Sequence, residues 1–168
     1  MKIFTSMYDY IIELANKKNV LPYLYGLSFI ESFIFPIPPD VLLAPIALTK
    51  KYNWLKLALN TTLFSVLGGL VGYTIGLYLF EISILSDFVE EEAFMNVKNL
   101  FIDNSVWIII IAGFTPLPYK VFTVTAGYMS LALIPFIIAS IIGRGLRFFL
   151  VAAISVSYTH LTLPTILL

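Results

Sequence analysis

Proline residues interrupt two of the three long apolar stretches of this 168-residue chain, and these interruptions restrict its fold more than any other feature. The apolar stretches cover residues 21–48, 54–80 and 106–155. Each is long enough to supply a membrane-spanning helix, which needs roughly 20 residues. Within the first and third stretches stand Pro36, Pro38, Pro39, Pro116 and Pro118. Because proline lacks an amide hydrogen and clashes with the preceding turn, a helix must stop at each cluster.

The composition excludes a water-soluble domain. Charged residues make up 12% of the chain, whereas soluble domains carry about 25%. Ten basic and ten acidic residues cancel, so the chain lacks the positive excess with which proteins bind nucleic acids. There is no cysteine and a single histidine, and no set of residues has the spacing of metal ligands. We therefore expect an integral membrane protein with no metal, no cofactor and no nucleic-acid partner.

The two broken stretches predict helical hairpins that enter and leave the membrane on one side. Irregular backbone at membrane depth is tolerated only where it faces protein or a water-filled cavity. A further apolar helix follows each break, over 54–80 and over 131–155. We therefore expect an all-α membrane protein of two inverted repeats, each a re-entrant hairpin plus a transmembrane helix, as in transporters with a site near the midplane. The alternative is that the prolines mark ordinary turns outside the membrane.

Charge near the ends of the apolar stretches predicts the orientation. Residues 1–19 have the mixed polar and apolar pattern of an amphipathic segment on the bilayer surface. Lysines gather on one side, Lys50 and Lys51 among them, and acids gather in 81–104, which we expect to include a short amphipathic helix. Because cytoplasmic loops are rich in lysine and arginine, we expect the amino terminus and Lys51 inside and residues 90–92 outside.

Five acidic or basic residues are placed where lipid would exclude them: Glu31, Asp40, Lys120, Arg144 and Arg147. A charge at the centre of a membrane helix costs about 2.5–3.5 kcal/mol on insertion scales, so such groups need partners and are candidates for function. We expect the two acids to couple to ions and the three bases to attract an anionic headgroup. The alternatives are that the bases extend to the lipid headgroups and that all five only hold the hairpins together. Asp40 also suits the start of the following helix.

Glycine residues recur on the second apolar stretch. Gly68, Gly72 and Gly76 stand four residues apart and share one face of the expected helix. A face without side chains lets another helix approach closely. We assign these glycines to helix packing.

The order of these motifs resembles the DedA family of bacterial membrane proteins, also called the SNARE-associated or VTT-domain family, and its YqaA-like branch in particular. The resemblance rests on Glu31, the glycine ladder, and the runs at 35–40 (FPIPPD), 114–120 (FTPLPYK) and 143–148 (GRGLRF). It implies two inverted re-entrant hairpins and movement of lipids, such as undecaprenyl phosphate or phospholipids, coupled to an ion gradient. Glu31 and Asp40 match the membrane-embedded acids of the family, and Arg144 falls in its final basic motif. Many members carry arginine where this chain has Thr115.

The carboxyl-terminal residues differ from the rest of the chain. Residues 156–165 (VSYTHLTLPT) resemble the translation of a sequencing adapter. We therefore expect a membrane domain over 20–155, a non-native tail over 156–168, and a native gene that continues past Ser155 with one or more further helices. On this interpretation His160 is not a ligand or a base.

Together these features predict a lipid translocase of the bacterial inner membrane, coupled to protons or sodium ions. The sequence leaves open a transporter of small solutes or drugs and a non-transporting structural or assembly protein. No nucleophile–base pair, metal set or phosphate-binding loop is visible, so we do not expect an enzyme. The expected partners are membrane lipids, and the sequence is compatible with a homo-oligomer.

Overall fold

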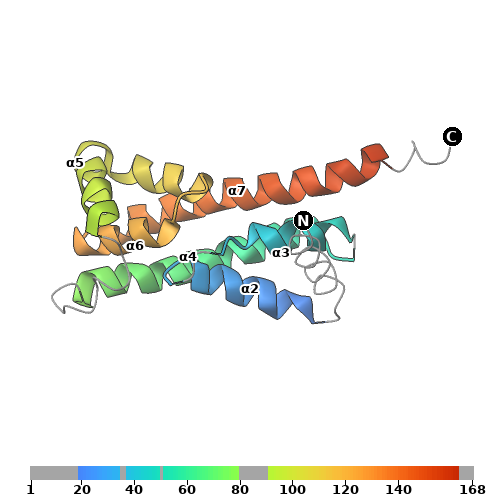
Figure 1. Ribbon diagram of the computed structural model, residues 1–168, viewed down its shortest axis with the longest axis horizontal. Coiled ribbons are helices and arrows are strands. Elements are labelled where there is room, and N and C mark those ends of the chain that lie inside the picture. Colours follow the sequence, from blue (N-terminus) through green and yellow to red (C-terminus); the bar gives the residue numbers. More distant parts are fainter. Residues whose placement is uncertain (1–18, 35–36, 50, 80–90, 163–168) are drawn as a thin grey trace.

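The computed structural model describes residues 19–34, 37–49, 51–79 and 91–162, and every regular element in these ranges is an α-helix. The all-helical class predicted from the sequence is therefore confirmed for these residues. The amphipathic segment expected over 1–19 lies outside the described residues, except for Asn19. Pro36 and residues 81–90 also lie outside them. Figure 1 shows the six helices: α2 (Val20–Glu31), α3 (Asp40–Leu48), α4 (Trp54–Leu79), α5 (Glu91–Phe114), α6 (Tyr119–Tyr128) and α7 (Leu133–Thr162).

Helices end and begin at both proline clusters. α2 ends at Glu31, and α3 begins at Asp40, directly after Pro39 in the N-cap position. α5 ends at Phe114, and α6 begins after Pro118, again in the N-cap position. Proline suits the start of a helix because the first amides have no partner within the helix.

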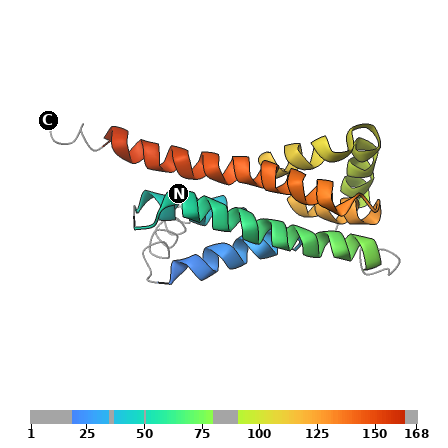
Figure 2. The ribbon, with the colours of Figure 1, turned by 180° about the vertical axis from the view of Figure 1, so that it is seen from behind.

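Two of the helices, α4 and α7, are long and apolar enough to cross a membrane. Their apolar segments, Trp54–Tyr78 and Leu133–Ser157, have 25 residues each, and the hydrocarbon core of a bilayer needs only about 20. The two helices contact each other and run side by side (Figure 1 and Figure 2). Large apolar side chains cover their outer faces, among them Leu59, Leu63 and Leu67 on α4 and Ile138, Leu146 and Leu150 on α7.

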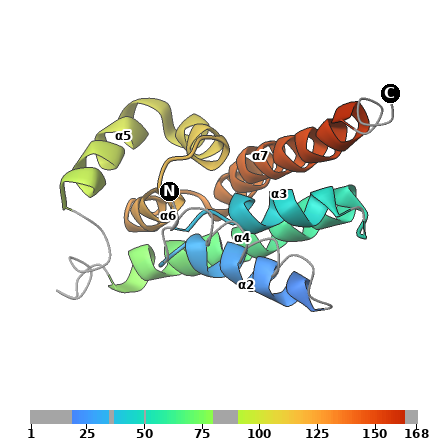
Figure 3. The same cartoon turned by 45° about the vertical axis from the view of Figure 1, so that its right-hand side comes forward.

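The shorter helices pack on these two in a crossed pattern (Figure 3). α2 lies on α4 while α3 lies on α7, and α5 lies on α7 while α6 lies on α4. The two helices that flank a break therefore contact different long helices. As a result the two breaks face each other, and residues of both line one cavity.

One expected boundary differs in the structure. Helix α5 begins at Glu91, so the helix expected in the acidic segment and the apolar residues after it form one continuous helix. Figure 1 shows that this helix changes direction along its length. Helix α7 continues through Thr162, and the domain boundary expected at residue 155 stays a prediction. The origin of the residues after Ser155 stays a prediction.

The glycine ladder of α4 lies where other backbones approach. A β-carbon on Gly68 would stand 2.0 Å from the carbonyl oxygen of Phe29 in α2, and one on Gly76 would stand 1.9 Å from that of Val124 in α6. A β-carbon on Gly72 would collide with a side chain of α6 at 2.3 Å. Helices α2 and α6 therefore pack against the face of α4 that carries the glycine ladder.

A methyl group on this face should separate α4 from α6. We expect Gly76→Ala to lower the free energy of unfolding in detergent by about 1–3 kcal/mol, because added atoms in a packed contact force the backbones apart. Gly26→Ala is the matched control, since a β-carbon there would meet nothing within 4 Å. Equal stability of the two variants would contradict the close contact at Gly76.

Candidate functional site

Two ion pairs connect the first break to α7. Glu31, the last residue of α2, accepts a hydrogen bond of 2.5 Å from Nη2 of Arg144. Asp40, the first residue of α3, accepts hydrogen bonds from Nε of Arg147, at 2.9 Å, and from its Nη2. The two arginines are three residues apart on α7 and therefore lie on one face of that helix. Each acid beside the break thus meets its own arginine.

Arg144 is fully buried, and four helices contribute to its surroundings. Its Nε donates a 2.6 Å hydrogen bond to Oγ of Ser65 on α4, in addition to the pair with Glu31 on α2. The centres of two aromatic rings lie close to its guanidinium carbon, Tyr119 of α6 at 4.9 Å and Phe148 of α7 at 4.6 Å. Ring faces attract a cation, so they offset part of the hydration that Arg144 has lost.

Arg147 is partly exposed and reaches both breaks. Beyond its pair with Asp40, its Nη1 donates a 2.6 Å hydrogen bond to the carbonyl oxygen of Thr115. Thr115 directly follows α5, and the last carbonyls of a helix lack partners and carry partial negative charge. One guanidinium therefore bridges the acid of the first break and the helix end of the second.

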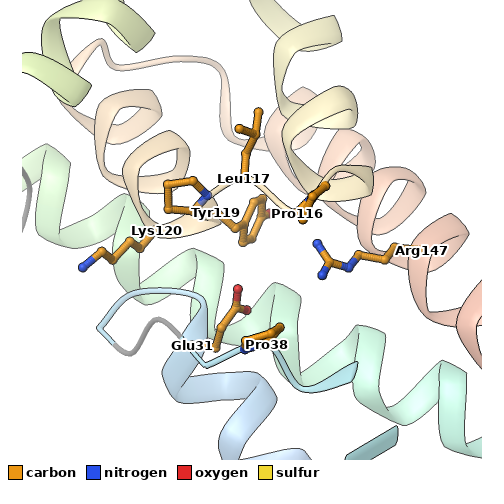
Figure 4. A pocket seen from close by; sticks show the side chains of 8 residues that line it. Glu31, Pro38, Pro116, Leu117, Tyr119, Lys120 and Arg147 are labelled. Atoms are coloured by element: carbon orange, nitrogen blue, oxygen red, sulfur yellow. The ribbon is translucent and has the colours of Figure 1, made fainter. Parts of the chain in front are cut away.

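A cavity of about 150 Å³ lies between the two breaks (Figure 4). Since a water molecule occupies about 30 Å³ in the liquid, the cavity has room for a small polar group. Its polar lining residues are Glu31, Tyr119, Lys120 and Arg147, and the remainder are Pro38, Pro116, Leu117 and Pro118. In Figure 4 the Glu31 carboxylate and the Arg147 guanidinium point toward this space from different helices, whereas the amine of Lys120 extends away.

The structure places the five ionisable candidates in three settings. The Glu31–Arg144 pair is the more buried and the Asp40–Arg147 pair the more exposed. Lys120 stands apart from both pairs, and its Nζ donates to the carbonyl oxygen of Ile34 at 3.4 Å. Arg144 is not among the residues that line the cavity. The described residues contain no group of three histidine or acidic side chains that could hold a metal ion.

Sequence reasoning missed two residues of the site, Ser65 and Tyr119. A signal was present for each. Ser65 lies three residues before Gly68, on the same face of α4 as the glycine ladder, and Tyr119 directly follows the second proline pair. Serine and tyrosine are common in membrane helices, so position alone did not single them out.

Comparisons with known proteins identify a family and similar proteins. The family model of the VTT domain matches residues 37–157. An uncharacterized protein of Haemophilus influenzae is 39% identical over 157 residues, which cover 92% of this chain and 82% of that protein. An uncharacterized protein of Histophilus somni is 36% identical over 153 residues, which cover 90% of this chain and 80% of that protein. No solved structure matches the chain.

The chain belongs to the VTT-domain family, which is also known as the DedA family. The resemblance found in the sequence is thereby confirmed at the level of the family. The protein is accordingly a membrane protein, as its composition and its two long apolar helices also indicate.

The buried ion pair makes a prediction about stability. Breaking a buried pair typically costs about 3–5 kcal/mol, because the remaining charge is left uncompensated. We therefore expect Glu31→Gln to lower the free energy of unfolding in mixed micelles by this amount, and Arg144→Met on the same background to restore much of it. Asp40→Asn is the control, because the Asp40–Arg147 pair is partly exposed and this variant should lose less free energy of unfolding. Equal losses in the two single variants would contradict the assignment of the more buried pair.

Proposed function

We propose that this protein moves a lipid with an anionic headgroup across the bacterial inner membrane, driven by a proton or sodium-ion gradient. The observation that carries the proposal is the cavity between the breaks, which has Arg147, Lys120 and Glu31 in its lining. The long helices around it present apolar faces outward. A cavity that has both charged and apolar residues in its lining, between helices with apolar outer faces, suits a ligand with a charged head and an apolar tail.

The packing pattern supports two inverted repeats. If α2, α3 and α4 exchange places with α5, α6 and α7, the contacts α2–α4 and α3–α7 become α5–α7 and α6–α4, which are also present. Two repeats related by a two-fold axis would give these four contacts, whereas the contact of α5 with α6 has no comparable counterpart between α2 and α3. We propose on this basis that each break is the tip of a re-entrant hairpin. The order of the sequence motifs, rather than the packing, supports our proposal that the chain belongs to the YqaA-like branch.

Arg147 offers a route for coupling. An anionic headgroup in the cavity competes with Asp40 for the same guanidinium, because both are acceptors that match its fork of donors. A carboxylate that loses its cation inside an apolar protein is stabilised by taking up a proton. Binding of the headgroup would in this way bring a proton or another cation to Asp40. Glu31 faces the same cavity and is the second acid available for coupling.

The ion pairs also favour a second candidate, a membrane structural or assembly protein that transports nothing. Four of the buried or partly buried charges form two ion pairs with one another. Such pairs are what a protein would contain if its charges served only to hold the hairpins together.

Transport can be tested with the purified protein in liposomes. We expect labelled undecaprenyl phosphate or an anionic phospholipid to change leaflet, faster under a pH gradient, and a zwitterionic phospholipid to move less. Arg147→Gln should slow the movement about tenfold, which corresponds to about 1.4 kcal/mol. Lys120→Gln should have a smaller effect, because the amine of Lys120 extends away from the cavity (Figure 4). Lys98→Gln is the matched control, because Lys98 lies over the Tyr128 ring and does not line the cavity.

Each alternative has its own outcome in this assay. Folded protein that moves no lipid under any gradient would favour the structural candidate. Uptake of a small water-soluble anion without lipid movement would favour a solute transporter. Equal rates in the Lys98 and Arg147 variants would exclude the cavity as the headgroup site.

The proposed orientation has a separate test, which the absence of cysteine makes direct. We expect a thiol reagent that cannot cross the membrane to label Glu91→Cys from the periplasmic side and to leave Lys51→Cys unlabelled, since lysine-rich loops stay in the cytoplasm. The reverse labelling would invert the topology.

A further inference from the structure

Tyr119 is a fully buried aromatic residue at the start of α6, and its contacts connect separate parts of the site. Its hydroxyl donates a 2.6 Å hydrogen bond to Oγ of Ser140 on α7. Its ring lies over the guanidinium of Arg144, and the side chain also lines the cavity (Figure 4). Gly69 of α4 leaves room for it, since a β-carbon there would stand 3.3 Å from the ring.

The Arg144 guanidinium depends on aromatic faces because hydrogen bonds do not use all of its donors. Nε binds Ser65 and Nη2 binds Glu31, but the buried Nη1 has no hydrogen-bond partner among the described residues. The aromatic rings of Tyr119 and Phe148 also lie close to the Arg144 guanidinium. A buried guanidinium stacked on aromatic faces regains electrostatic stabilisation that water would have given.

We propose that Tyr119 is a positioning residue whose ring holds Arg144 in contact with Glu31. Phe148 belongs to the same helix as Arg144 and moves with it. The contact between them therefore does not change when α6 moves. Tyr119 belongs to α6, on the far side of the second break. A displacement of α6 relative to α7 therefore changes the surroundings of Arg144 and, through it, of Glu31. The consequence for transport rests on the proposed function, whereas the contact itself does not.

The chain permits a direct test because Arg144 and Arg147 are its two arginines. In nanodiscs, protein with isotope-labelled arginine gives one set of guanidinium NMR signals from each, and Arg147→Lys assigns the set of Arg144. Neighbouring ring faces shift these proton signals upfield. We expect Tyr119→Leu to move the Arg144 signals toward those of a free arginine and to merge its separate N–H signals. Tyr119→Phe and Ser140→Ala should leave them in place, because the ring remains and only the hydroxyl contact is lost.

A second series keeps the test decisive if Tyr119→Leu does not fold. In this series Tyr119 is replaced by phenylalanine with one, two or three fluorine atoms on its ring. Each fluorine reduces the negative potential of the ring face with little change of shape. We expect the Arg144 N–H signals to broaden stepwise with the number of fluorines. The change that Glu31→Gln produces in the Arg144 signals should shrink in the same order, because a loosened guanidinium contacts Glu31 for less of the time.

Three results would overturn the proposal. The first is an unchanged Arg144 signal in folded Tyr119→Leu. The second is an equal change in Tyr119→Phe or Ser140→Ala, which would assign the effect to the hydroxyl. The third is no dependence on fluorination. None of these measurements involves lipid movement, so a failure of the proposed function would leave this test intact.

Discussion

The buried guanidinium of Arg144 is the interaction on which the arrangement of the membrane domain depends. A charge without access to water costs several kcal/mol unless partners surround it. Its partners are Glu31, Ser65 and Tyr119, which come from α2, α4 and α6, and Phe148 of α7 itself. Because each partner belongs to a different helix, satisfying this one cation fixes α2, α4 and α6 against α7.

The second arginine differs from the first in exposure, and this difference underlies the proposed function. Arg144 is enclosed, whereas the side chains of Arg147 and Asp40 are 13% and 20% exposed. In a more hydrated setting a pair is held less tightly and exchanges partners at lower cost. Arg147 also lines the cavity and contacts both breaks. The more buried pair is therefore suited to hold the helices together, and the more exposed pair to meet the ligand of the proposed function.

Local chemistry made part of the fold predictable from the sequence. The proline clusters gave the ends of α2 and α5 and the starts of α3 and α6, since a missing amide hydrogen acts on the turn in which it stands. The apolar lengths gave α4 and α7 to within a few residues at their first ends. The full length of α5 was not predicted because its first half mixes charged and apolar residues while its second half is almost entirely apolar. Hydropathy therefore separates two segments that form one helix.

The sequence by itself determined that this chain is a helical membrane protein with two breaks and charges that need partners, because length, hydropathy and proline act locally. Only the tertiary structure decided which partners meet. Glu31 and Arg144 are 113 residues apart, and Asp40 and Arg147 are 107 apart, and no local pattern relates such distant positions. The crossed packing of α2, α3, α5 and α6 on α4 and α7 determines these pairs, leaves Lys120 outside them, and brings Tyr119 to the face of a buried cation.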